Sequence, residues 1–298
     1  MTDPNRPLLT PEQLLDGWTP ARIGRRIVTL AETESTNSVA LASAGDPGCD
    51  GLAVLADFQT AGRGRVGRTW LAPRGAGILC SVLLCSPPAF LESAAPRGGR
   101  TGPLGRGYPS GASCPPLPEA TEASGRLTLA AAVAVCEAIR TATDVSPAIK
   151  WPNDLRVSGR KLAGILIESR VVEAQVRAWV IGIGINCYQQ AGHFPPEIRE
   201  TATSLDLASS QPVNRTAVAR ELLKALDSML APSKAPSLEA LHASWLAHAE
   251  PLGQRVRLRS EGREYSGRTV AVDPAGGLIV QCDDGRRQWF DPLLTTLF

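Results

Sequence analysis

A long stretch rich in proline and glycine divides this 298-residue chain into two unequal parts. Eight prolines and several glycines are interleaved between Ser86 and Gly125, and hydrophobic residues recur there with a period of neither 2 nor 3.6. Such a stretch cannot bury enough apolar surface to offset the conformational entropy lost on folding. We therefore predict a disordered insertion over residues 86–125, and we expect the segments on either side of it to build the fold.

The segment before the insertion has the patterns of two helices and two strands. Thr10, Pro11 and Gln13 match a capping box at a helix start. A second helix is expected from Ser35 to Gly45. Residues 52–58 and 77–85 are apolar runs typical of buried strands.

The segment after the insertion changes from mixed patterns to strands alone. We expect an Ala-rich helix over residues 127–140, strands over 145–151, 162–168 and 177–186, and helices capped by Asn214 and Ser237 that end at Leu230 and Ala249. Beyond Pro251, short alternating strands over 255–258, 265–272, 278–281 and 288–290 predict a small β-barrel-like module. The predicted domains are residues 1–249 and 250–298.

Composition excludes several classes of protein. The net charge is +2, from 31 basic and 29 acidic residues, so a nucleic-acid-coating protein is not expected. The seven cysteines form no C-x-x-C pair and their number is odd, which argues against a zinc site and a disulfide framework. The N-terminus has no secretory apolar region, and the longest apolar stretch, residues 127–139, is too short to span a bilayer. We expect a cytoplasmic protein.

Three glycines alternate with three arginines in the segment from Gly62 to Arg68, which is followed by Trp70. Glycines let the backbone wrap closely around a ligand, arginines supply forked donors for carboxylate or phosphate oxygens, and a tryptophan can stack on a flat base. A solvated basic loop is the alternative.

Two lysines flank a turn in the segments Lys150–Asp154 and Gly159–Leu166. A hairpin there would aim Lys150 and Lys161 into one cleft as point charges for an anion, and Asp154 offers oxygen to magnesium. A surface hairpin with solvated lysines is the alternative.

Two further segments combine small or polar residues. Gly182 and Gly184 would let a ligand lie against a strand that ends at Asn186, although sheet packing alone can require such glycines. Cys187 occupies the third glycine position of a dinucleotide fingerprint, and no P-loop motif occurs. Ser35-Thr36-Asn37 is typical of a helix N-terminus, which also binds polar ligand groups.

Taken together and in this order, the segments resemble the biotin protein ligase family. Its pattern comprises S-T-N, Q-x-x-G-R-G-R-x-G-R-x-W, K-W-P-N-D, R-K-L-A-G-I-L and G-x-G-x-N. The matching residues are 35–37, Gln59 with 62–70, 150–154, 160–166 and 182–186. The resemblance covers roughly residues 25–235 apart from the insertion. The C-terminal strands resemble the family's SH3-like domain less specifically.

The resemblance implies both a fold and a reaction. The fold would be an α/β catalytic domain with a mixed sheet, similar to the class II aminoacyl-tRNA synthetase core, followed by a small SH3-like β-barrel. Biotin carboxylate would attack the α-phosphate of Mg-ATP to give biotinyl-adenylate and pyrophosphate. A lysine of a biotin carboxyl carrier protein or domain would then attack the mixed anhydride. ATP and Mg²⁺ enter as co-substrate and metal, and no prosthetic group is expected.

The resemblance also assigns roles to residues. Catalysis would fall to Lys161, which holds the biotin carboxylate and the α-phosphate, and to Arg65 and Arg68, which close over the adenylate and pyrophosphate. The expected biotin-binding residues are Ser35, Thr36, Asn37, Gln59, Gly62, Arg63, Arg65, Lys161, Gly164 and Gly182. The expected ATP-binding residues are Arg65, Arg68, Trp70, Lys150, Asn153 and Asn186, with Asp154 as a magnesium ligand.

Two other functions remain open. A lipoate or octanoate ligase of the same superfamily is the nearer one, although Gly62–Trp70 with Lys150–Asp154 fits the biotin branch. A non-catalytic biotin- or nucleotide-binding module is the other, although it would not need Lys161. Only about 25 residues precede the catalytic segment, too few for the winged-helix domain of some family members. We therefore expect no DNA binding, and a monomer or weak homodimer.

Overall fold

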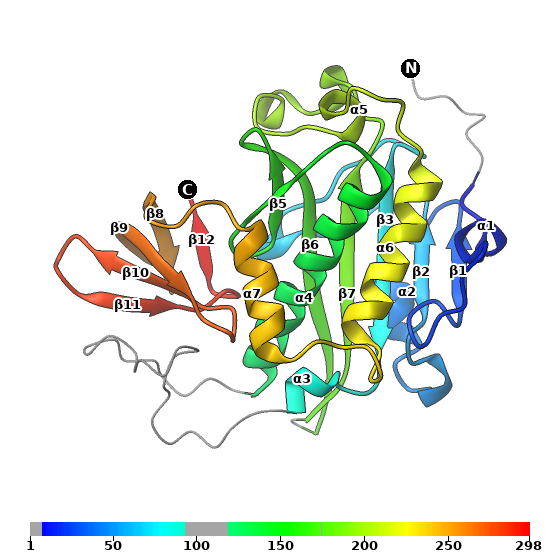
Figure 1. Cartoon of the computed structure of the whole chain (residues 1–298), viewed down its shortest axis with the longest axis horizontal. Helices are drawn as coiled ribbons and strands as arrows, with labels where there is room; N and C mark the ends of the chain where they lie inside the picture. The colour runs from blue at the N-terminus through cyan, green and yellow to red at the C-terminus, as the bar shows by residue number, and fades with distance from the viewer. Residues whose placement is uncertain (1–7, 93–118, 174) are drawn as a thin grey trace.

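Two β-sheets organise the chain (Figure 1). The computed structural model describes residues 8–92, 119–173 and 175–298. The larger sheet has the strand order β1-β2-β3-β7-β6-β5-β4, and the smaller one has the order β11-β10-β9-β8-β12. Strands β1 and β2 run parallel while the other pairs of the larger sheet are antiparallel, so that sheet is mixed. This is a mixed α/β architecture with a separate C-terminal antiparallel sheet.

The larger sheet contains five strands where the sequence predicted them and two that it did not predict. Its members are β1 (Ile27–Leu30), β2 (Ala53–Ala56), β3 (Gly77–Leu84), β4 (Ala148–Lys150), β5 (Asp154–Val157), β6 (Arg160–Val172) and β7 (Gln175–Asn186). Only β4 remains of the strand expected over residues 145–151. Strands β1 and β5 were missed, and both owe their extended form to pairing with neighbours.

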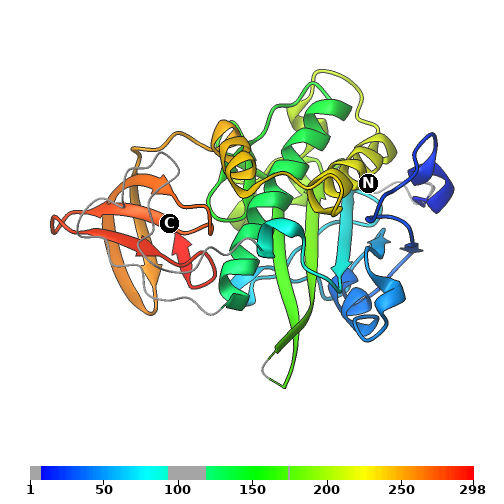
Figure 2. The same cartoon turned by 60° about the horizontal axis from the view of Figure 1, so that its bottom comes forward.

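Helices cover both faces of the larger sheet. On one face lie α4 (Glu119–Ala142), α6 (Arg215–Leu230) and α7 (Leu238–His248), as Figures 1 and 2 show. Almost every side chain of α4 from Leu127 to Ile139 is buried, because this helix packs on the sheet and is itself covered by α6 and α7. Helix α2 (Thr36–Ala42) packs on the opposite face, in a separate cluster with Val54, Leu83 and Val180.

The Pro/Gly-rich insertion is shorter than the composition suggested. Helix α3 (Ala89–Glu92) follows β3, and α4 already begins at Glu119. Residues 86–92 and 119–125 were therefore wrongly assigned to a disordered stretch. Arg126 forms a buried ion pair with Glu122 at 2.5 Å, and Gly125 packs directly against the backbone of Ala275, so tertiary contacts stabilise this first part of α4. Residues 93–118 lie outside the described part of the chain.

Local capping signals were reliable. Thr10 and Gln13 form the reciprocal capping box of α1 (Pro11–Leu15). Asn214 and Ser237 accept backbone hydrogen bonds at the starts of α6 and α7. Ser35 precedes α2 as predicted, but its side chain makes no capping hydrogen bond. Among the described residues, the remaining α-helix is α5 (Leu205–Ala208).

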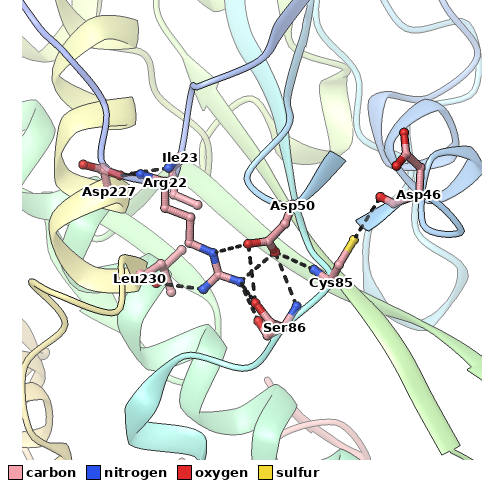
Figure 3. Close-up of polar contacts among 8 residues, drawn as sticks. All are labelled: Arg22, Ile23, Asp46, Asp50, Cys85, Ser86, Asp227 and Leu230. Carbon is pink, nitrogen blue, oxygen red and sulfur yellow. Dashed lines mark hydrogen bonds and ion pairs between the residues drawn. The ribbon is translucent and has the colours of Figure 1, made fainter. Parts of the chain in front are cut away.

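A buried polar cluster ties the segment before β1 to the rest of the domain (Figure 3). Asp227 of α6 accepts hydrogen bonds from the backbone N–H groups of Ala21, Arg22 and Ile23. The Arg22 guanidinium donates to Asp50, to the carbonyl of Leu230 and to Ser86. Each charge in this cluster is hydrogen-bonded, which is the condition for burying charge at low cost.

The C-terminal sheet packs beside the larger sheet. It comprises β8 (Arg255–Ser260), β9 (Arg263–Val272), β10 (Leu278–Cys282), β11 (Arg287–Phe290) and β12 (Thr295–Leu297), of which only β12 was not predicted. Trp151 Nε1 donates to the Gly276 carbonyl at 2.7 Å, and His242 Nε2 lies 2.7 Å from the Val272 carbonyl. Among the described residues, no helix has the length and apolarity needed to cross a membrane.

Candidate active site

All five motif segments meet at one cavity of about 60 Å³ on the α2 side of the larger sheet. The glycines of β6 and β7 face this side, while the alternate residues Ile181, Ile183 and Ile185 belong to the core beneath α4. The lining consists of Ser35, Thr36, Asn37, Gln59, Arg63, Gly64, Arg65, Trp70, Leu79, Asn153, Lys161, Gly164, Ile165, Leu166, Gly182, Ile183 and Gly184.

A chain of buried hydrogen bonds forms one wall of the cavity. Gln59 Oε1 accepts from the backbone N–H of Thr36 at 2.7 Å and from its hydroxyl at 2.9 Å. Ser81 Oγ on β3, which is fully buried, lies 2.7 Å from Thr36 Oγ1 and 2.6 Å from Asn37 Oδ1. A fully connected buried network of this kind fixes the orientation of each member. The wall can therefore present preset donors and acceptors to an uncharged polar ligand group.

The same network continues to an ion pair. Asn37 Nδ2 donates to Glu168 Oε2 at 2.6 Å. Arg63 donates to both oxygens of Glu168, through Nε at 3.2 Å and Nη2 at 2.9 Å, and to Ser38 Oγ at 2.8 Å. The two-pronged contact fixes the plane of the guanidinium and ties the glycine-arginine segment to β6.

Two glycines of β7 are required by the side chains above them. A Cβ atom on Gly182 would lie well inside 3.0 Å of the Asn37 amide, and one on Gly184 would lie equally close to the Trp70 indole. Trp70 also contacts the position of Gly164 on β6. The indole therefore lies flat across both strands. Its Nε1 is buried and makes no hydrogen bond within the described residues.

Lys161 is the cation in the middle of the site. Its Nζ pairs with Asp154 Oδ1 at 2.6 Å and lies 5.6 Å from the centre of the Trp70 ring. An ammonium group has three N–H donors, so donors remain for a second anion. Lys150 stands opposite Asp154 in the β4–β5 pair. Burial lowers the pKa of Lys150, and the nearby charges of Arg156 and Lys161 lower it further.

Arg65 connects the glycine-arginine segment with the C-terminal sheet. Its Nη1 donates to Asn153 Oδ1 at 3.0 Å. Its Nη2 donates to the carbonyls of Pro292, Leu293 and Thr295, the last two at 3.2 Å. Burial lowers the pKa of Arg65, although the charges of Asp154 and Asp291 oppose that shift.

Comparisons with known proteins identify the family. Residues 33–97 and 118–186 match the model of the biotin/lipoate A/B protein ligase family, and residues 252–291 match that of the biotin protein ligase C-terminal domain. A biotin–[acetyl-CoA-carboxylase] ligase of Mycobacterium tuberculosis is 33% identical over 94% of this chain and 93% of its own length. This chain belongs to the biotin protein ligase family.

Two more relatives support that assignment. The bifunctional ligase/repressor BirA of Bacillus subtilis is 30% identical over 88% of this chain and 71% of its own length. The biotin protein ligase of Aquifex aeolicus in complex with biotin and ATP has a TM-score of 0.68 at 25% identity, covering 92% of this chain and 99% of that one. The mixed sheet and the separate C-terminal sheet described above are thus the architecture of biotin protein ligases.

Some residues predicted for this ligase site do not line the cavity. Gly62 packs against the Trp70 carbonyl, and Arg68 is exposed. Asn186 is buried, donating to the Thr203 carbonyl at 2.9 Å and accepting from Gln189 at 2.9 Å. Lys150 and Asp154 stand beside the cavity rather than in its lining. Their roles in this ligase remain predictions.

The sequence did not reveal three parts of this ligase site. Glu168 lies two and four residues beyond Leu166 and Gly164 on the same face of β6, so strand alternation carried a usable signal for it. Ser81 lies within an apolar strand and had no such signal. The carbonyls of Pro292, Leu293 and Thr295 had none either, because they are backbone groups more than 200 residues away from Arg65.

A second cavity adjoins the first. Its volume is about 230 Å³, and it shares Arg63, Gly64, Arg65, Asn153, Ile165 and Leu166 with the smaller one. Its remaining walls come from Thr128 of α4, from Ile167 and Glu168 of β6, from Val66 and Pro152, and from Pro292 and Leu293 of the turn between β11 and β12. The glycine-arginine segment therefore borders two connected spaces in this ligase.

Proposed function

We propose that this ligase joins biotin to ATP as biotinyl-adenylate and then transfers biotin to a lysine of a carrier protein. The observation that carries the proposal is the composition of the first cavity. It combines a preset, uncharged hydrogen-bonding wall around Thr36 and Gln59 with the cations Lys161 and Arg65. Biotin has the matching groups, an uncharged ureido ring and a carboxylate.

Positioning and charge would supply most of the catalysis. In the first step a carboxylate oxygen attacks the α-phosphorus, and the bond to pyrophosphate breaks. Negative oxygens converge there, so a preorganised cation stabilises the transition state. Lys161 would hold the carboxylate and the α-phosphate with the donors that Asp154 leaves unused. In the second step an uncharged lysine amine attacks the carbonyl carbon, and AMP leaves.

The remaining assignments follow the same logic. Ser35, Thr36, Asn37 and Gln59 would bind the ureido group, while Gly164 and Gly182 would leave space for the ring and its chain. Arg65 and Arg68 would cover the adenylate and pyrophosphate, and Trp70 would stack near the adenine. Lys150, Asn153 and Asn186 would contact phosphate or ribose once the nucleotide is bound.

Magnesium would enter with ATP as part of the substrate. The described residues contain no group of three histidine, cysteine, aspartate or glutamate side chains arranged to hold a metal ion. Asp154 is engaged by Lys161, so it is at most one ligand among phosphate oxygens and waters. Magnesium commonly binds in this way, through one or two carboxylates plus substrate phosphates.

The domains, the acceptor, the cellular compartment and the oligomeric state of the enzyme belong to the same proposal. The catalytic domain, residues 1–249, would share the core of class II aminoacyl-tRNA synthetases, and residues 250–298 would form an SH3-like barrel. The acceptor would be the biotin carboxyl carrier domain of a biotin-dependent carboxylase. The enzyme would act in the cytoplasm as a monomer or weak homodimer.

The test is a transfer assay with competing acids. Purified protein is incubated with Mg-ATP, a carrier domain and either labelled biotin, lipoate or octanoate, and the carrier is analysed by mass spectrometry. Addition of biotin alone, dependent on ATP and on the acceptor lysine, is the expected result. Preferential addition of lipoate or octanoate would assign the enzyme to the other branch, and no ATP-dependent addition would indicate a binding module.

A further inference from the structure

We propose that the C-terminal sheet positions Arg65 for its ligand, and that Asp291 is the positioning residue. The inference rests on the proposed function. The turn between β11 and β12 supplies three carbonyl acceptors to one nitrogen of Arg65, from residues 292, 293 and 295. Arg65 itself lies in the segment that borders both cavities. The turn between β11 and β12, which contributes no reacting group, thus holds the guanidinium of Arg65 in the active site.

Asp291 determines the shape of this turn. Its side chain is buried, and its Oδ1 accepts from the backbone N–H of Leu293 at 2.6 Å and of Leu294 at 3.3 Å. An aspartate that accepts from the backbone two residues ahead fixes a turn in one conformation. With the N–H groups held inward, the carbonyls of residues 292 and 293 are directed toward Arg65.

Both ends of the turn are anchored in the sheet. Phe290 pairs with Leu278 of β10 and is buried. Thr295 pairs with Ser260 of β8, and their hydroxyl groups lie 2.9 Å apart. Both ends of the turn are therefore held in place by the sheet. The segment that it contacts, by contrast, is rich in glycine and has an exposed Val66. A rigid acceptor set of this kind selects one rotamer of a long, flexible side chain.

Two N–H donors of the guanidinium remain for the ligand. Nη2 is used by the three carbonyls and Nη1 donates to Asn153, whereas Nε makes no hydrogen bond with the described residues. The Nε–H and the second N–H of Nη1 therefore remain as separate donors, each able to form a charge-assisted hydrogen bond with a carboxylate or phosphate oxygen. Because the side chain is already ordered, less conformational entropy is lost when the anion binds. Asp291 thereby acts on the adenylate through Arg65 without touching it.

The experiment compares Asp291→Ala with Asp291→Asn in the full-length enzyme. Alanine removes the acceptor, whereas asparagine keeps a carbonyl oxygen that accepts the same two N–H bonds. We expect Asp291→Ala to raise the KM for biotin and the leakage of adenylate onto bystander albumin about tenfold, the worth of one charge-assisted contact. The kcat should change less than twofold, and Asp291→Asn should restore wild-type values. Asp283→Ala, at an exposed carboxylate of the same sheet, is the matched control.

Two further measurements isolate the path through Arg65. In an Arg65→Gly background, Asp291→Ala should add nothing to KM or leakage, because the positioned side chain is gone. Leu294→Gly, which loosens the turn at an exposed side chain, should act in the same direction if Asp291→Ala does not fold. Wild-type KM in the folded Asp291→Ala and Leu294→Gly variants, or an undiminished effect without Arg65, would overturn the inference. Failure of the wild-type enzyme to form adenylate would instead refute the proposed function.

Discussion

Substitution of Gly182 by alanine tests the buried network at the centre of the site. The new Cβ would collide with the amide of Asn37, which is itself buried and held by Ser81 and Glu168 at 2.6 Å each. Asn37 cannot keep both hydrogen bonds and also make room. A methyl group added at position 182 of β7 is therefore expected to break the hydrogen bonds of Asn37 with Ser81 and Glu168.

The magnitude follows from those two contacts. A neutral buried hydrogen bond contributes about 1 kcal/mol, and one to a charged group about 1.5–3 kcal/mol. Their joint loss lowers the free energy of unfolding by about 3 kcal/mol, and biotin affinity should fall about a hundredfold if the displaced amide enters the cavity. Gly192→Ala is the matched control, since nothing lies within 4 Å of its Cβ position.

The assays are urea unfolding followed by circular dichroism and biotin binding by calorimetry. The double variant Asn37→Ala/Gly182→Ala should be no less stable than Asn37→Ala alone, because the collision is then relieved. The reasoning fails if Gly182→Ala unfolds and binds biotin like the Gly192→Ala control, or if the two substitutions are additive.

Three further outcomes are expected. Lys161→Ala should slow pyrophosphate release in a single turnover about a hundredfold to a thousandfold with little change in ATP affinity, and a wild-type rate would make Lys161 a surface lysine. Burial raises the pKa of Asp227, but hydrogen bonds from Lys234 and the backbone N–H groups of Ala21, Arg22 and Ile23 outweigh it and hold the pKa below its ordinary value. The contribution of Asp227 to the free energy of unfolding is therefore present above pH ~4 and is lost as the pH falls through the folded-state pKa. The Asp227→Ala variant should therefore lose less stability between neutral and acidic pH than the wild-type protein. An unchanged stability–pH profile would contradict this. Replacement of residues 93–118 by a short Gly/Ser linker should leave the melting transition and activity largely unchanged, since closure entropy depends weakly on loop length, and loss of cooperative melting would show a structural role.

Local signals in the sequence determined the helix starts and the chemical character of the site. The capping box of Thr10 and the caps of Asn214 and Ser237 depend on atoms within four residues, so the sequence alone was sufficient. The motif segments likewise showed which residues carry charge and which are glycines that let a ligand approach the backbone closely. Their spacing along the chain did not show which of them would share a cavity.

Only the tertiary structure decided the partners of those residues. Long-range pairing extended α4 back to Glu119 against the C-terminal sheet, made strands of β1, β5 and β12, and placed Asn186 among buried hydrogen-bond partners. It also brought Glu168 to Arg63 across 105 residues and three backbone carbonyls to Arg65 across more than 225. The type of each residue determines its side-chain chemistry, but the energy of a contact depends also on the second group. When that group is a distant backbone carbonyl, the sequence gives no signal for it, because every residue type has one.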